Sequence, residues 1–222
     1  MVARPVEEFR GARERLVETL QQKGIRDLAV LRAVEMTPRH DFVPSGLRHR
    51  AYEDSALPIG SGQTISQPFL HARYLELLQL TGRERVLEVG TGSGYQTVLL
   101  AHLVAQVFSI ERISALLQQA REAIQRAGVR NVSLLLGDGS VGWREYAPYD
   151  AILVGAGAPS VPQPLVDQLA EGGRLLVPVG DRAEQRLVVA RRKGDKIETT
   201  EVAPVRFVPL VGSHGWSAGE RQ

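Results

Sequence analysis

The chain has 222 residues, a formal net charge of +2 and no cysteine, which excludes disulfides, thiol nucleophiles and thiolate metal sites. Its hydrophobic content of 43% and charged content of 23% are ordinary for a soluble globular protein. No apolar run approaches the roughly twenty residues of a membrane span, and no basic block interleaves with aromatic residues as in nucleic-acid-binding surfaces. We therefore expect a monomeric cytoplasmic protein that binds neither membranes nor nucleic acid.

The N-terminal region predicts two helices followed by a long irregular segment. The first helix covers residues 6–23, where apolar side chains recur at helical spacing. The second begins after Asp27, a suitable N-cap, and reaches Met36, because Pro38 cannot continue it. Residues 37–67 show no long periodicity and contain several prolines and glycines, yet they are rich in apolar side chains. This composition favours an ordered functional loop over a disordered one.

From residue 68 onward, helical patterns alternate with short apolar strands. The predicted helices cover 68–80, 95–104, 114–127 and 162–170. The predicted strands of this part cover 85–89, 106–110, 132–136, 151–154 and 174–177. This alternation implies a parallel, doubly wound α/β sheet. Two last strands, 186–190 and 197–205, flank a Lys-Gly-Asp-Lys turn and predict an antiparallel hairpin at the sheet edge.

The most informative stretch is Val86–Tyr95. There a predicted strand delivers Glu88 and leads into a loop with glycine at every second position, which is the nucleotide-binding corner of a doubly wound sheet. The dinucleotide fingerprint Gly-x-Gly-x-x-Gly is not met, because its third position falls on Tyr95 or Thr97. Glu88 would repel a pyrophosphate but suits an ammonium group. The pattern favours S-adenosylmethionine, which carries an α-ammonium and no phosphate, over the alternative of a structural strand-to-helix turn.

Two acidic residues follow the next two predicted strands. Glu111 stands about twenty positions past the glycine loop, where an acidic residue accepts hydrogen bonds from ribose hydroxyls in this fold. A surface glutamate at a helix N-terminus is the alternative. Asp138 follows the third strand, where its carboxylate can accept a hydrogen bond from the exocyclic amine of adenine. A simple Asp-Gly turn is an equally good interpretation of that residue.

The segment Ala56–Pro68 reads Ala-Leu-Pro-Ile-Gly-Ser-Gly-Gln-Thr-Ile-Ser-Gln-Pro and resembles the signature of protein-L-isoaspartate O-methyltransferases. The resemblance covers about residues 5 to 212, and its other matching stretches are Arg39–Pro44, Tyr52, Glu88–Tyr95, Gly137–Gly139, Pro148–Ile152 and Val205–Leu210. It implies methyl transfer from S-adenosylmethionine to the free α-carboxyl of L-isoaspartyl residues in damaged proteins and peptides. The methyl ester then closes to a succinimide, which initiates repair, and S-adenosylhomocysteine is the second product.

The resemblance also implies the architecture of an S-adenosylmethionine-dependent methyltransferase that uses no metal. We expect a single domain over residues 1–222, whose Rossmann-like, mostly parallel core occupies 81–212. Helices and a loop that covers substrate and cofactor occupy 1–80. The loop would bind an extended peptide through its backbone groups. A tail that matches nothing in the family occupies 213–222.

The resemblance gives the active-site role to Ser66. We expect Ser66 to orient the substrate carboxylate through a hydrogen bond and not to act as a covalent nucleophile, because a sulfonium is an activated methyl donor. A lone histidine is more often structural, so His71 ranks below Glu111 as a cofactor contact. Val211 receives no role, since valine lacks the hydroxyl that some relatives offer there. The expected cofactor contacts are Gln63, Thr64, Ile65, Ser66, His71, Glu88, Gly90, Gly92, Ser93, Glu111, Arg112, Asp138 and Gly139.

Two other functions remain open on sequence alone. A methyltransferase with a similar core could act on RNA or a small molecule, which would predict a basic groove or a catalytic motif after the fourth strand. Val154–Pro159 offers only small residues at that place. A module that binds the cofactor without turnover is the non-enzymatic alternative, and the intact Ser66 segment and glycine loop argue against it.

Overall fold

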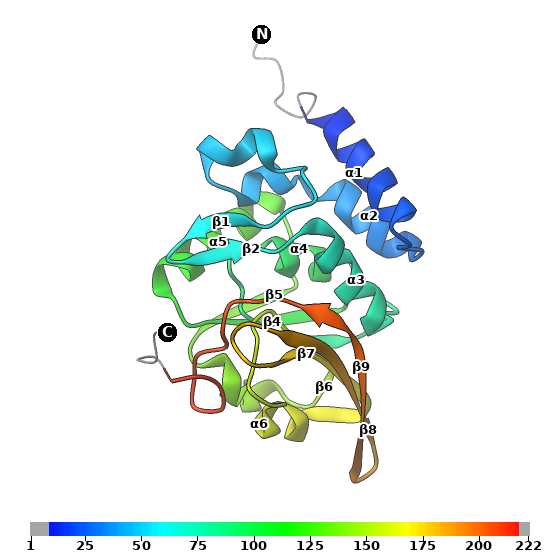
Figure 1. The fold of residues 1–222 in the computed structure, drawn as a ribbon, viewed down its shortest axis with the longest axis vertical. Helices are drawn as coiled ribbons and strands as arrows, with labels where there is room; N and C mark the ends of the chain where they lie inside the picture. Colours follow the sequence, from blue (N-terminus) through cyan, green and yellow to red (C-terminus); the bar gives the residue numbers. More distant parts are fainter. Residues whose placement is uncertain (1–8, 218–222) are drawn as a thin grey trace.

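The structure is a computed structural model that describes residues 9–217 (Figure 1). Its centre is a seven-stranded sheet with the order β5-β4-β3-β6-β7-β8-β9. The strands from β5 to β7 pair in parallel, whereas β8 and β9 add antiparallel at one edge. The predicted doubly wound sheet with an antiparallel edge hairpin is therefore confirmed. The strand bounds are β3 (Arg85–Val89), β4 (Gln106–Glu111), β5 (Val132–Leu136), β6 (Tyr149–Val154), β7 (Leu169–Gly180), β8 (Gln185–Lys193) and β9 (Lys196–Val205).

Both faces of the sheet are covered, which explains why its central strands are almost continuously apolar. Successive residues of a strand point to opposite faces, so Val86 belongs to one hydrophobic cluster and Leu87 to the other. The first cluster packs against the helices α1–α5, and the second packs against α6 (Gln163–Asp167). The bounds of the helices on the first face are α1 (Arg10–Gln22), α2 (Leu28–Met36), α3 (Pro68–Leu78), α4 (Tyr95–Ala101) and α5 (Ser114–Ala127).

The N-terminal helices agree with the prediction except at the start of the first. Helix α1 begins at Arg10, and the predicted residues before position 9 lie outside the described part of the chain. Asp27 caps α2 as expected, because its Oδ1 accepts from the amides of Ala29 at 2.9 Å and Val30 at 3.2 Å. No helix within residues 9–217 is long and apolar enough to cross a bilayer.

The prediction of an irregular segment over residues 37–67 was wrong. Two 3-10 helices, η1 (Arg39–Phe42) and η2 (Ser45–Arg50), are followed by an antiparallel hairpin of β1 (Leu57–Gly60) and β2 (Gln63–Ile65). Elements of three to six residues are too short to produce a periodic signal. The hairpin closes through a turn in which Ser61 and Gly62 have φ of 51° and 69°. In the view of Figure 1 it lies above the strands of the sheet, and a Cβ placed at Gly92 of the glycine corner would lie 3.5 Å from Ile59 of β1.

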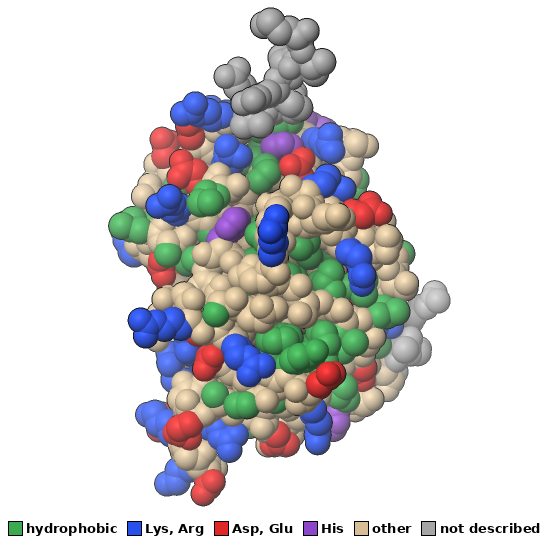
Figure 2. Space-filling model, turned by 180° about the vertical axis from the view of Figure 1, so that it is seen from behind, with side chains coloured by type: hydrophobic (Ala, Val, Ile, Leu, Met, Phe, Trp, Pro, Cys, Tyr) green, Lys and Arg blue, Asp and Glu red, His purple; other side chains and the backbone are tan. Residues whose placement is uncertain are grey.

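The later elements differ from the prediction mainly at their ends. Helix α6 is shorter than predicted, because Leu169 already pairs with Tyr149 as the first residue of β7. Beyond β9 the chain returns across the sheet, and Val211 forms a bridge with Trp216. The tail expected over 213–222 is thus ordered at its start, and residues 218–222 lie outside the described part of the chain. On the face that Figure 2 shows, basic and acidic side chains are interspersed and do not separate into patches of one sign.

Candidate active site

Two adjoining cavities lie beyond the carboxyl ends of β3, β4 and β6, beneath the β1–β2 hairpin. Thr64, Gly90, Gly92 and Gly155 line both of them, so the cavities form one continuous site. The first cavity also takes the predicted residues Gln63, Glu111, Arg112 and Gly139. The second also takes the predicted residues Ile65, Ser66, His71, Glu88 and Ser93. Among the predicted site residues, only Asp138 lines neither cavity in the described part of the structure.

The glycine loop shapes the floor that the two cavities share. Gly90 has φ of 96°, and its amide donates to the carbonyl of Ile110 over 2.8 Å, which draws the loop towards β4. Gly94 has φ of 86°, and a Cβ placed there would lie 3.1 Å from Ile124 of α5. Both positions therefore require glycine, one for the turn and one for the turn together with close helix packing. Because glycine has no side chain, the backbone of the loop can come close to a ligand in the cavities.

Glu111 lines the first cavity. Its side chain is 5% exposed, with Oε2 accepting from the Gly92 amide and Oε1 accepting from the Ile113 amide, each at 2.9 Å. These bonds fix the carboxylate at the end of β4. Each carboxylate oxygen has a second lone pair, so Glu111 can still accept hydrogen bonds from a ligand in the cavity. Two vicinal hydroxyls, as in a ribose, suit that arrangement.

Glu88 occupies the second cavity as a largely desolvated carboxyl group. Its side chain is 1% exposed, and its Oε2 accepts from Thr97 Oγ1 at 2.5 Å and from Ser109 Oγ at 2.6 Å. Burial raises the pKa of Glu88 to about 7, against the opposing effect of these two hydroxyl bonds. Its Oε1 is buried and has no partner within residues 9–217. An ammonium group would satisfy that oxygen and favour the ionised form.

Further polar atoms in the second cavity also lack partners. His71 Nδ1 bonds Gln96 Oε1, which makes Nδ1 the donor and leaves Nε2 as an acceptor. Burial, followed by the charge of Arg39, lowers the pKa of His71 to about 3, so the imidazole is neutral. His71 Nε2, Gln96 Nε2 and the Tyr74 hydroxyl are buried without hydrogen-bond partners among the described residues. The second cavity therefore offers an acceptor at Glu88 Oε1 and a donor at Gln96 Nε2. This pair fits a zwitterion such as the amino-acid end of S-adenosylmethionine.

Sequence reasoning did not identify Gln96 or Tyr74, and one signal for Gln96 was available. Gln96 and Thr97 are polar residues in the otherwise apolar run Tyr95–Ala101, and all of that helix is buried. A buried amide needs a partner, which points to a site. Tyr74 gave no such signal, because tyrosine is common at partly buried helix positions. The segment Val208–Val211 also lines the first cavity, although from sequence Val211 receives no role and Val208–Leu210 is only part of a stretch that matches the family.

Ser66 follows β2 directly and lies in the second cavity. Its carbonyl accepts a hydrogen bond of 2.9 Å from Nη2 of the buried Arg39. Among the described residues, the hydroxyl of Ser66 does not hydrogen-bond His71, whose Nε2 has no partner. His71 Nδ1 bonds the amide of Gln96 and not a carboxylate, so the relay of a serine hydrolase is not formed there. The arrangement suits a hydroxyl that donates a hydrogen bond to a ligand at the mouth of the glycine corner.

Asp138 is turned away from the cavities and towards the C-terminal segment. Its Oδ1 accepts from the amide of Ser140 at 2.8 Å and from the hydroxyl of the same residue at 2.6 Å. Its Oδ2 accepts from the amide of Ser213 at 2.7 Å. The next residue, Gly139, does reach the first cavity. The carboxylate expected at the adenine edge therefore anchors the start of the tail in this structure. In addition, no cluster of three potential metal ligands forms within residues 9–217.

The chain is similar to known proteins in family, sequence and fold. The family model described as Protein-L-isoaspartate(D-aspartate) O-methyltransferase (PCMT) matches residues 11–215. A protein-L-isoaspartate O-methyltransferase from Syntrophobacter fumaroxidans is 51% identical over 94% of this chain and 98% of its own length. One from Roseiflexus is 50% identical over 95% of this chain and 97% of its own.

Solved structures give the same result. A structure named protein-L-isoaspartate O-methyltransferase superposes with a TM-score of 0.83 and 31% identity over 91% of this chain and 67% of that one. A Plasmodium falciparum structure described under the same family name, in complex with S-adenosyl-L-homocysteine, has a TM-score of 0.79 and 29% identity over 90% of this chain and 98% of its own. This chain belongs to the protein-L-isoaspartate O-methyltransferase family.

Proposed function

We propose that this protein transfers the methyl group of S-adenosylmethionine to the free α-carboxyl of L-isoaspartyl residues in proteins and peptides. The ester that forms can close to a succinimide, so the reaction initiates repair of the damaged residue. The observation that carries the proposal is the position of the segment Thr64–Ser66: Thr64 lines both cavities, and Ser66 lines the second beside the glycine corner. Family membership supports the same activity.

The two cavities divide the cofactor between them in this proposal. The first cavity holds the adenosine part, with Glu111 accepting from the ribose hydroxyls and Gly139 close to the base. The second cavity holds the amino-acid part, where the unpartnered Glu88 Oε1 receives the ammonium and the free Gln96 amide donates to the carboxylate. S-adenosylmethionine supplies an activated methyl group on a sulfonium. Gln63, Thr64, Ile65, Ser93 and Arg112 complete the proposed contacts.

The residues of this chain act by alignment and by exclusion of water. The hydroxyl of Ser66 donates a hydrogen bond to one oxygen of the substrate carboxylate, which directs the other oxygen towards the methyl group. The carboxylate is ionised at neutral pH, so no general base is required. The neutral His71, bonded to Gln96, forms a fixed polar wall. The β1–β2 hairpin covers the site, which holds the two reactants together without competing solvent.

The decisive experiment is incubation with tritiated S-adenosylmethionine and two matched peptides that contain isoaspartate or aspartate. We expect label in the isoaspartyl peptide alone. Equal labelling of both peptides, or of neither, would contradict the proposal, and labelling of RNA alone would favour a different methyltransferase. We also propose that the protein works as a monomer in the cytoplasm, in keeping with a chain that has no cysteine. Light scattering during size-exclusion chromatography, which measures the molar mass in solution, would test whether the protein is a monomer.

A further inference from the structure

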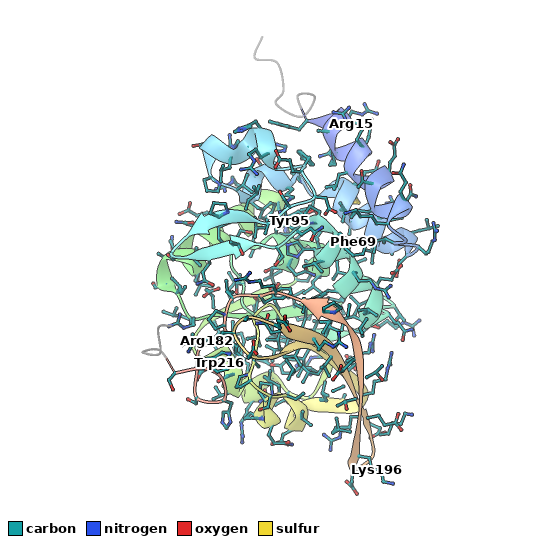
Figure 3. All side chains as sticks on the ribbon, in the orientation of Figure 1. Arg15, Phe69, Tyr95, Arg182, Lys196 and Trp216 are labelled. Carbon is teal, nitrogen blue, oxygen red and sulfur yellow. The ribbon has the colours of Figure 1, made fainter. Side chains whose placement is uncertain are left out.

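A buried arginine lies directly behind the Ser66 segment, outside the two cavities. Arg39, in η1, is 0% exposed, and its Nη2 donates to the Ser66 carbonyl oxygen over 2.9 Å. Its guanidinium also lies over the ring of Tyr95, 5.0 Å from the ring centroid. Tyr95 is buried in the interior of the molecule (Figure 3). The donors Nε and Nη1 of Arg39 are buried and have no hydrogen-bond partner in residues 9–217. The chain thus keeps a cation where a fully buried residue is normally apolar.

The surroundings balance the charge of Arg39 only in part. Burial lowers the pKa of Arg39 to about 10, so the guanidinium remains protonated at neutral pH. The groups that raise the pKa of Arg39 are Tyr95, Asp54 and Tyr52. Burial raises the pKa of both tyrosines, so Asp54 is the ionised member of the three at neutral pH. Its carboxylate already accepts from three donors, Lys23 among them. The imidazole of His71 is neutral and adds no charge of either sign. A net positive charge therefore remains behind Ser66.

We propose that Arg39 is a positioning residue that makes the Ser66 site prefer a carboxylate over a neutral amide. Its bond to the Ser66 carbonyl fixes the backbone at the point where Ser66 lines the second cavity. Its charge stabilises an anion held against that segment, because a unit charge several ångströms away acts strongly where water is excluded. This inference rests on the proposed function, since it concerns how the isoaspartyl carboxylate is held.

The test compares an isoaspartyl peptide with its isoasparaginyl counterpart, in which an amide replaces the carboxylate. KM and kcat for the acid and the inhibition constant of the amide are measured with wild-type protein and with Arg39→Met, which removes the charge and keeps a long apolar side chain. We expect KM for the acid to rise about 10- to 100-fold, and the inhibition constant of the amide by about threefold at most. The matched control is Arg48→Met, an exposed arginine of the neighbouring η2, which should change neither value.

Arg39→Lys supplies a second measurement, because lysine keeps the charge but loses the planar fork that bonds the carbonyl. We expect this variant to keep the preference for the acid while its kcat falls. Equal loss of affinity for acid and amide in Arg39→Met would overturn the proposal, since Arg39 would then only support the backbone. Loss of the preference in Arg39→Lys would overturn it too, and this result decides alone if Arg39→Met does not fold. Failure of the proposed function appears differently, as absence of any labelling of the isoaspartyl peptide by the wild-type protein.

Discussion

Substitution of Glu88 by glutamine should stabilise the ligand-free protein and weaken its binding of cofactor. The pKa of Glu88 is raised from 4.5 to about 7 by burial, so in the folded state the carboxyl group resists ionisation. A difference of this size corresponds to about 3 kcal/mol at 1.36 kcal/mol per pKa unit. Glutamine has the same shape and keeps one acceptor oxygen for the hydroxyls of Thr97 and Ser109. It cannot ionise, and it therefore avoids this cost.

The pH window of the effect follows from the direction of the shift. Below pH 4.5 the carboxyl group is protonated in both the folded and the unfolded state, so Glu88 contributes no pH dependence. Between pH 4.5 and about 7 the folded state binds more protons than the unfolded state, and the free energy of unfolding falls as the pH rises. Above about pH 7 the full cost is present. Relative to wild type, Glu88→Gln should thus gain about 3 kcal/mol between pH 4.5 and pH 8.

Denaturant unfolding of both proteins at several pH values, without ligand, measures this gain directly. In a protein of this length it also corresponds to a rise in melting temperature on the order of 10 °C. Calorimetric titration with S-adenosylhomocysteine at pH 8 should show affinity about 10- to 100-fold weaker for the variant, because a hydrogen bond to a charged group is lost. Stability curves of variant and wild type that run parallel from pH 5 to pH 8 would refute the reasoning, since Glu88 would then be ionised throughout.

Substitutions at three other residues test the remaining parts of the site. Glu111→Ala should weaken binding of S-adenosylhomocysteine by about 1–3 kcal/mol, and an unchanged dissociation constant would place Glu111 outside the ribose site. Ser66→Ala should slow methylation of an isoaspartyl peptide about 10- to 1,000-fold with little change in cofactor affinity, and Ser66→Thr should slow it less. Near-normal turnover of the alanine variant would mean that backbone groups alone hold the carboxylate. Asp138→Ala should increase hydrogen exchange at the amide of Ser213, and unchanged protection there would show that Asp138 does not anchor the tail.

Local signals made the glycine corner predictable from sequence. A run of β-branched and apolar residues specified β3, and Gly90 and Gly94 mark positions where the backbone adopts positive φ. The carboxylates of Glu88 and Glu111 follow from the register of the parallel strands, because each sits at the same end of its strand. These features depend on a few neighbouring residues and on the general geometry of the fold, and the structure contains each of them.

Long-range contacts explain what sequence reasoning could not supply. The orientation of Asp138 is set by Ser213, which lies 75 residues further along the chain. This contact belongs to a C-terminal turn in which Trp216 donates to the carbonyl of Gly157 and lies against Arg182 (Figure 3). Arg39 was expected only as part of a family motif, because an arginine is normally exposed. Its burial becomes evident only when η1 packs behind the Ser66 segment.

Most of the buried side chains that have unpartnered polar atoms line the second cavity, where the methyl donor and the substrate carboxylate have to be aligned. In the described part of the chain, the buried side chains with such atoms are Arg39, His71, Tyr74, Glu88, Tyr95 and Gln96. Each such atom destabilises the ligand-free fold, since its bonds to water are not replaced. In the proposed binding mode, a zwitterionic ligand in the second cavity restores several of those bonds, so part of its binding free energy is the relief of a cost already present in the folded protein. Substitutions that make this cavity apolar should therefore stabilise the empty protein and weaken ligand binding together, which is the relation that Glu88→Gln measures at a single residue.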